Sequence, residues 1–267
     1  MAEANTLCSL STAFLQESIL EQVLLVTGAS RGIGAATALL AARQGYAVAV
    51  NYAANSGAAD EVVSRIRSEG GKAIAIQADV AHEEQVLALF AAIDAQLGRL
   101  TALVNNAGIV DVTARLEEMS VARLKRMFDV NVIGSLVCAR EAVRRMSTKH
   151  GGQGGAIVNV SSAASRLGAP GQYLDYAAAK GAIDSFTLGL AKEVAAEGIR
   201  VNAVRPGLIE TEIHASGGLP DRVRQLAHLV PMQRGGTAEE VAEAIVWLLS
   251  PQASYTTMSL IDVSGGR

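Results

Sequence analysis

The stretch QVLLVTGASRGIG, residues 22–34, sets an apolar run directly before a glycine-rich turn. The run QVLLVT (22–27) predicts a buried strand, and AATALLAARQ after the turn predicts a helix. Gly28, Gly32 and Gly34 stand where the strand would give way to the helix. Glycines there permit a tight turn and let the backbone approach a pyrophosphate at the helix N-terminus. A purely structural turn is the alternative, but the agreement of strand, turn and helix favours dinucleotide binding.

Apolar runs of strand length alternate with helical patterns along the rest of the chain. Further strands are predicted at 46–51, 72–78, 100–106, 156–161, 199–205 and near 258–263, with helices at about 56–69, 83–97, 120–146, 173–196 and 238–249. Strict alternation with apolar strands predicts an α/β fold, a doubly wound parallel sheet of about seven strands with helices on both faces. No linker divides residues 21–267, so we expect a single Rossmann-type domain.

The composition limits the class of protein. Half of the 267 residues are hydrophobic and 18% are charged, which allows a large core. The net charge of −3 and the lack of a basic run argue against a nucleic-acid partner. The two cysteines fit a reducing cytoplasm, and the four histidines show no metal-ligand spacing. Residues 1–20 read as an N-terminal extension without signal-peptide features, and no segment is apolar enough to span a membrane.

Short polar motifs follow the glycine-rich turn. DYAAAK (175–180) places Tyr176 and Lys180 one helical turn apart on a shared helix face. On these six residues alone, a chance pairing on a solvated helix is the simplest explanation. The other motifs are Asp79-Val80, NNAG (105–108), VNVIG (130–134) with Asn131, Ser161-Ser162, and Pro206-Gly207 with Thr211.

In this order, and with the glycine spacing G-x-x-x-G-x-G, the motifs resemble those of the short-chain dehydrogenase/reductase family over residues 21–267. Through VSSAASRLGAPGQY and VRPGLIETEIHASGG, the chain is similar to bacterial members labelled glucose-dehydrogenase-like or uncharacterised oxidoreductases. The resemblance implies hydride transfer between a nicotinamide and a carbonyl or secondary alcohol. It also makes a chance origin of DYAAAK untenable.

The resemblance implies four catalytic residues, Asn131, Ser162, Tyr176 and Lys180. Ser162 would bond the substrate oxygen, and we expect Ser161 to be a strand-end serine that bonds backbone. Asn131 would bend its helix and hold a water that extends a proton relay to Lys180. A free tyrosine has a pKa near 10, so only about one in a thousand is ionised at pH 7. We therefore expect the ammonium of Lys180, acting together with the charge of an oxidised nicotinamide, to lower the pKa of Tyr176.

The resemblance also implies which residues hold the cofactor. NAD-dependent members carry an acidic residue just after the second strand, where this chain has Asn51, Tyr52 and Ala53. Arg31 resembles the basic residue that pairs with the 2′-phosphate of NADP, although a surface role is its alternative. We therefore expect NADP(H) rather than NAD(H). The implied contacts are Gly28, Ser30, Arg31, Gly32, Ile33, Gly34, Asn51, Tyr52, Asp79, Val80, Asn106, Ala107, Gly108, Tyr176, Lys180, Pro206, Gly207 and Thr211.

Residues 208–236 occupy the place of the family's variable substrate lid. His214 and Met232 are candidates for substrate contact or for an interface, whereas the spacing of Trp247 predicts a core position. Met258 stands where the family usually has glycine. The enzymatic alternative is a 3-oxoacyl-carrier-protein reductase, for which Arg222, Arg224 and Arg234 are the local basic candidates. A non-catalytic dinucleotide-binding regulator is the alternative from another class, and family members are mostly homotetramers.

Overall fold

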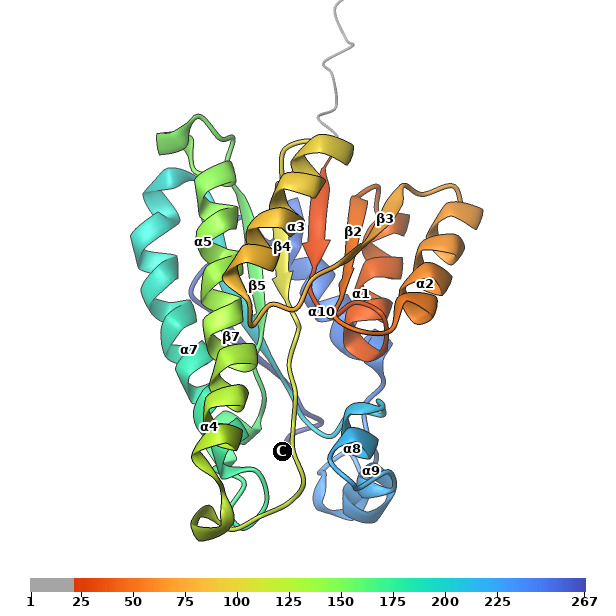
Figure 1. The fold of residues 1–267 in the computed structure, drawn as a ribbon, viewed down its shortest axis with the longest axis vertical. Helices are drawn as coiled ribbons and strands as arrows, with labels where there is room; N and C mark the ends of the chain where they lie inside the picture. The colour runs from red at the N-terminus through yellow and green to blue at the C-terminus, as the bar shows by residue number, and fades with distance from the viewer. Residues whose placement is uncertain (1–21) are drawn as a thin grey trace, which may run out of the picture.

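The structure is a computed structural model that describes residues 22–267, with the backbone alone for His214 and Ser216. The predicted extension, residues 1–20 with Cys8, lies outside the described residues. Figure 1 shows one sheet between two layers of helices, which confirms the predicted fold. Of the described helices, none is long and apolar enough to cross a membrane.

Seven parallel strands form the sheet in the order β3-β2-β1-β4-β5-β6-β7. The chain moves outward from β1 to β3 and then returns to β4 on the other side of β1. The carboxyl ends of β1 and β4 therefore flank a crevice, which is where ligands bind in such sheets. The strands are β1 (Val23–Val26), β2 (Ala47–Tyr52), β3 (Ala73–Gln77), β4 (Ala102–Asn105), β5 (Gly155–Val160), β6 (Ile199–Pro206) and β7 (Leu260–Val263).

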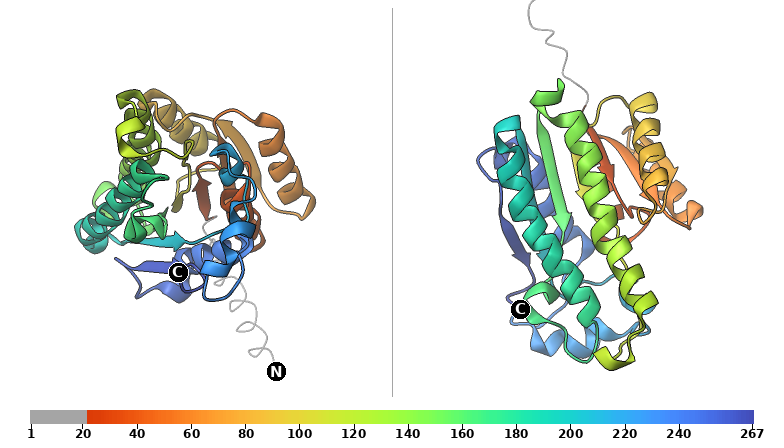
Figure 2. Two further views of the ribbon diagram at one scale, coloured as in Figure 1. Left: turned by 90° about the horizontal axis from the view of Figure 1, so that it is seen from below. Right: turned by 60° about the vertical axis from the view of Figure 1, so that its left-hand side comes forward.

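Long helices cover both faces of the sheet, because each βαβ crossover carries the chain over one face. One face holds α1 (Gly32–Arg43), α2 (Ser56–Ser68) and α10 (Ala238–Leu249); the other holds α3 (Glu83–Gln96), α5 (Gly134–Met146) and α7 (Leu174–Val194). Figure 2 shows α5 and α7 running side by side along the sheet. The other helices are α4 (Val121–Phe128), α6 (Ala164–Leu167), α8 (Ile213–Ser216), α9 (Arg222–Leu226) and 3₁₀ turns at Leu116–Glu118, Thr148–His150, Ala195–Glu197, Ala227–Leu229 and Pro251–Ala253.

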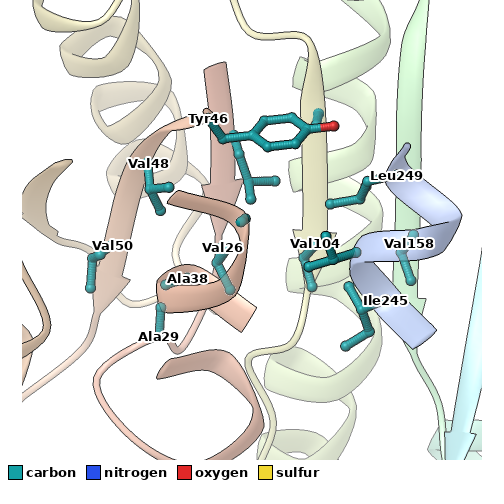
Figure 3. Close-up of a cluster of buried hydrophobic side chains, with 14 of the residues drawn as sticks. Val26, Ala29, Ala38, Tyr46, Val48, Val50, Val104, Val158, Ile245 and Leu249 are labelled. Carbon is teal, nitrogen blue, oxygen red and sulfur yellow. The ribbon is translucent and has the colours of Figure 1, made fainter. Parts of the chain in front are cut away.

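Two aliphatic clusters fix the helices to the sheet. In Figure 3, Val26, Val48 and Val104 of the strands meet Ala38 of α1 and Ile245 of α10. The opposite cluster packs Phe90 of α3 and Cys138 of α5 on Leu25 and Leu103. Small aliphatic residues suit this core, because they let helices approach the strands closely. The scarcity of aromatics in the sequence thus matches how the layers pack.

The predicted helix at 120–146 is interrupted in its middle. Residues Asp129–Ile133 form a π-helical turn between α4 and α5, with Asn131 at its centre. The Asn131 Nδ2 donates to the Met127 carbonyl at 3.0 Å and to the Ile109 carbonyl at 3.1 Å. Its side chain therefore ties the bent helix to the loop after β4, as π turns at functional sites often do.

Two residues near the C-terminal end depart from expectation. The prediction of a core position for Trp247 is wrong, since its side chain is 44% exposed. The buried face of α10 is made instead by residues such as Val241, Ile245 and Leu248. Met258 adopts a left-handed conformation with φ of 62°, which explains why glycine is usual there.

Candidate active site

A cavity of about 850 Å³ opens at the carboxyl ends of the strands, where the order of the sheet reverses between β1 and β4. The view from below in Figure 2 looks onto this end of the sheet. The cavity runs from the glycine-rich turn past Tyr176 to the segment 208–222, which carries α8 and α9. Its sheet side is formed by strand ends and α7, and its opposite side by the predicted lid.

The glycine-rich turn has no room for side chains at two positions. Gly28 has φ of 60°, a conformation that favours glycine. A Cβ atom at Gly34 would lie 2.5 Å from both the Asn106 Nδ2 and the Gly28 carbonyl oxygen. The turn leads into α1, whose first residue is Gly32, and the preceding Arg31 makes no side-chain capping bond. The backbone N–H groups at this helix start are thus suited to a pyrophosphate.

Polar side chains lock the turn to the neighbouring strands. The Asn106 Nδ2 donates to the carbonyls of Thr27 and Gly28 at 2.8 and 2.9 Å. The Thr27 Oγ1 accepts from the backbone N–H groups of Asn106 and Ala107, both at 3.0 Å. These bonds connect the ends of β1 and β4 directly, so the turn keeps its shape without a ligand.

The two predicted cofactor contacts at the end of β2, Asn51 and Tyr52, have different roles in the structure. Asn51 is buried, and its amide donates to the carbonyls of Ile76 and Ala78 and accepts from the Gly28 N–H. Its side chain therefore holds the glycine turn and the end of β3 together. Tyr52 lines the cavity, and no carboxylate follows it before α2. Arg31 lines the same part of the cavity from the glycine turn.

Tyr176, Ser162 and Lys180, three of the four residues that we expect to be catalytic, all line the cavity. Tyr176 and Lys180 share a face of α7, and the Lys180 Nζ lies 5.5 Å from the centroid of the Tyr176 ring. Ser162 follows β5, where its Oγ accepts from the Ala164 N–H at 3.1 Å. The side chains of Ser162 and Tyr176 lie close enough for the serine hydroxyl to act on the pKa of Tyr176. A serine and a phenol thus meet at one point of the cavity.

The two serines after β5 have different surroundings. Ser161 is buried, and its Oγ donates to the Asp184 Oδ1 at 2.6 Å and to the Lys180 carbonyl at 3.2 Å. Asp184 is in turn held by Arg205 at 2.9 Å. Ser161 therefore fixes α7 against β5, beyond the simple backbone role that we predicted. Both serines line the cavity, but Ser161 is the one that is bonded to Asp184.

Lys180 and Asn131 lie behind the loop after β4. The Lys180 Nζ donates to the Val160 carbonyl at 2.7 Å, and the residue is 4% exposed. A Cβ at Gly108 would come within 2.7 Å of the Asn131 Oδ1 and 3.6 Å of the Lys180 Nζ. Asn131 itself is fully buried and does not line the cavity. It lies next to Lys180 and shapes the loop by accepting from the Ile109 N–H at 3.2 Å.

The pKa of Tyr176 is raised in the protein alone, whereas our prediction of a lowered pKa concerns Lys180 together with an oxidised nicotinamide. Burial raises the pKa of Tyr176, and the hydrogen bond with Ser162 only partly opposes that effect. Burial also lowers the pKa of Lys180 to about 8, against the nearby negative charge of Asp184. The sequence shows the one-turn spacing but not the desolvation of both groups, which disfavours each charged form.

The structure brings most of the predicted cofactor residues to one cavity and adds residues that the sequence analysis missed. All of the predicted cofactor residues line the cavity except Gly34, which lies beneath the turn. Thr211 packs over the turn, with its Cγ2 3.2 Å from a Cβ built at Gly32. Met232 is exposed and does not line the cavity, and the side chain of His214 lies outside those described. The residues missed include Ile109, Leu167, Gln172, Tyr173 and Arg267.

The residues present fit a nicotinamide dinucleotide. A turn that excludes Cβ atoms, an uncapped helix start and a long cavity leading to Tyr176 match a diphosphate with a nucleoside at each end. Among residues 22–267, no three His, Cys, Asp or Glu side chains are placed to hold a metal ion. Fold and site together define a dinucleotide-binding α/β oxidoreductase.

Comparisons with known proteins agree with this class of protein. A family profile described as enoyl-(acyl carrier protein) reductase matches residues 28–267. An uncharacterised oxidoreductase of Escherichia coli, YgfF, is 60% identical over 92% of this chain and 99% of its own. A 3-oxoacyl-[acyl-carrier-protein] reductase of Synechocystis is 42% identical over 92% of this chain and 96% of its own. A Mycobacterium marinum short-chain type dehydrogenase/reductase superposes with a TM-score of 0.86 at 36% identity, covering 92% of this chain and 94% of its own. The chain belongs to the short-chain dehydrogenase/reductase family.

Proposed function

We propose that this protein is an NADP(H)-dependent reductase of small carbonyl compounds, with Ser162, Tyr176 and Lys180 as its catalytic residues. The observation that carries the proposal is the meeting of Ser162 and Tyr176 in the cavity, with a phenol whose pKa burial raises. A protonated phenol suits a general acid, because reduction of a carbonyl requires a proton at oxygen. Reduction is therefore the direction that we expect at neutral pH.

Each residue has a distinct task in this proposal. A bound nicotinamide would supply the hydride to the carbonyl carbon. Ser162 donates a hydrogen bond to the carbonyl oxygen, and Tyr176 gives that oxygen its proton as negative charge develops. Lys180 then places its positive charge near the phenolate that remains. Asn131 is a positioning residue, because it holds the loop and the bent helix beside Lys180.

The preference for NADP(H) rests on the end of β2 and on Arg31. No carboxylate follows β2 to repel a 2′-phosphate, and Arg31 is among the residues that line the cavity. We expect NADPH to bind about 10- to 100-fold more tightly than NADH, the range of a charge-assisted hydrogen bond. Titration of both cofactors tests this, with Arg31→Gln predicted to remove the preference. Arg43→Gln at the far end of α1 is the matched control, because Arg43 pairs with Glu69.

A small-molecule substrate is favoured over an acyl carrier protein. Such a carrier is acidic and needs unneutralised basic side chains near the lid. Arg224 pairs with Asp221 at 3.0 Å, and Arg234 pairs with Glu240, whose pKa falls to about 2 through its hydrogen bond with Arg234. Two of the three basic candidates are thus neutralised. Only Arg222 has no carboxylate partner among the ion pairs of the described residues.

The direct test is NADPH oxidation across ketones, sugars and acyl thioesters, with NADH in parallel. We expect turnover of small carbonyl compounds with NADPH, and loss of that turnover in Tyr176→Phe. Preferred turnover of an acyl thioester on its carrier would instead favour the carrier-protein reductase. Tight NADPH binding without turnover of any carbonyl compound would favour a binding protein over an enzyme.

We further propose that the protein assembles as a homotetramer, as its family often does. Several large hydrophobic side chains are exposed on α4 and the adjoining π turn, including Val121 and Ile133, and Tyr255 is fully exposed after α10. Exposed apolar groups on neighbouring turns are typical of contacts between subunits. Sedimentation velocity at micromolar protein would overturn this proposal if it found a monomer.

A further inference from the structure

The cavity extends beyond Tyr176 to an end that the proposed chemistry does not use. Gln172 and Tyr173 line it from the start of α7, Arg222 from α9, and Arg267 from the segment after β7. The carboxylates that line the cavity lie elsewhere: Asp79 follows β3, and Glu212 lies beside Gly32 of the glycine turn. The far end therefore gathers two guanidinium groups, and no Asp or Glu side chain is among its described lining residues.

Arg222 differs from its basic neighbours in the lid. Its Nη2 donates to the Gln172 Oε1 at 2.6 Å, and its guanidinium lies 5.1 Å from the centroid of the Tyr173 ring. A neutral amide and a ring face hold the group in place without neutralising its charge. A guanidinium has five N–H donors arranged as a fork, so most of the fork is available to a ligand. Burial and the positive charge of Arg267 lower the pKa of Arg222, while Tyr173 opposes them.

Tyr173 supplies a second, independent observation. The side chain is 5% exposed, and its hydroxyl has no hydrogen-bond partner among the described residues. Buried hydroxyls are nearly always paired, because an unpaired one loses its hydrogen bonds to water without replacement. Tyr173 lines the cavity three residues before Tyr176, which is about one helical turn. The guanidinium of Arg222 thus packs on the ring whose hydroxyl is unpaired among the described residues, and that hydroxyl lies next to Gly217 of the lid segment.

We propose that Arg222, Tyr173 and Gln172 form a subsite for the carboxylate of the substrate, which is therefore an oxo acid or the corresponding hydroxy acid. This inference rests on the proposed function and names its substrate class. The guanidinium of Arg222 pairs with the carboxylate, and the hydroxyl of Tyr173 donates to one of its oxygens. Because the subsite begins one turn from Tyr176, a short carbon skeleton separates the carboxylate from the reacting carbonyl.

The test compares acids with their uncharged esters. NADPH-dependent reduction is measured for 4-oxopentanoate and 5-oxohexanoate and for the methyl ester of each, which keeps the carbonyl and its skeleton. We expect the wild type to prefer the acids in kcat/KM. Arg222→Gln should reduce the acid-over-ester ratio by about 10- to 100-fold, and Tyr173→Phe by about 3- to 10-fold. Arg224→Gln is the matched control on the same helix, since its side chain is 81% exposed.

Saturation-transfer NMR of 4-oxopentanoate with the NADPH-bound protein gives a readout that needs no turnover. We expect a signal with the wild type and with Arg224→Gln, and its loss with Arg222→Gln. Equal use of acids and esters, or an acid preference that Arg222→Gln retains, would overturn the subsite while leaving the carbonyl reductase intact. If no carbonyl compound is reduced, the proposed function fails, and the NMR comparison alone decides whether the subsite binds a carboxylate.

Discussion

The elements that flank the cavity on its two sides hold their charged side chains in different ways. On the sheet side, Arg123 of α4 and Asp175 of α7 form an ion pair at 2.8 Å with side chains 10% and 0% exposed. On the lid side, Arg224 and Asp221 pair at 3.0 Å with side chains 81% and 56% exposed. Buried pairs fix geometry, whereas exposed pairs contribute little. The sheet side is thus preorganised for chemistry, and the lid can vary at little cost to the fold.

The largest expected effect comes from breaking the buried pair. Asp175 accepts from Arg123 and also from the Tyr176 N–H at 3.0 Å, at the start of the catalytic helix. Asp175→Asn leaves the guanidinium of Arg123 buried without its counter-charge. We expect a loss of about 3–5 kcal/mol in the free energy of unfolding, measured by urea denaturation.

The matched change on the lid side is Asp221→Asn. We expect it to alter the free energy of unfolding by less than about 0.5 kcal/mol, because solvent already screens the exposed pair. Equal losses for the two variants would contradict the contrast between the two sides.

Lys180 gives the sheet side a pH-dependent stability. Its pKa falls from 10.5 in the unfolded chain to about 8 in the folded protein. Between these values the unfolded chain binds more protons, so the free energy of unfolding rises with pH. Relative to Lys180→Met, we expect the wild type to gain roughly 2–3 kcal/mol between pH 8 and 10.5.

Urea denaturation of both proteins at several pH values measures this gain. Lys192→Met, which removes an exposed lysine from the same helix, serves as the control and should follow the wild type. If the curves of wild type and Lys180→Met stay parallel, Lys180 is not desolvated as described.

A smaller effect is expected from filling the glycine turn. Gly34→Ala adds a methyl group where a Cβ would lie 2.5 Å from the Gly28 carbonyl oxygen. We expect it to reduce the free energy of unfolding by about 1–3 kcal/mol and to weaken NADPH binding. Gly57→Ala, at an exposed position in the first turn of α2, is the control and should be neutral or stabilising. Tight NADPH binding by Gly34→Ala would remove the turn from the cofactor site.

The same contrast explains what the sequence could predict. The strand, turn and helix around Gly28 follow from local stereochemistry, and the spacing of Tyr176 and Lys180 follows from helix geometry. Both features can therefore be predicted from the sequence alone. The direction of the Tyr176 pKa depends on desolvation, which arises only when α7 packs against the strands. Likewise, Arg222 and Arg224 are two residues apart in sequence, yet only the fold places one in the cavity and the other in an ion pair.

The most direct test of the central claim is a single-turnover reduction with NADPH by the wild type and by Tyr176→Phe, alongside a fluorescence titration of NADPH. Removing a general acid typically costs about 10²- to 10⁴-fold in rate. We predict a loss in this range, with NADPH affinity unchanged within about threefold, because the phenylalanine keeps the ring and removes only the proton donor. A reduction rate retained within about tenfold would contradict the role of Tyr176 and the proposed chemistry of the sheet side.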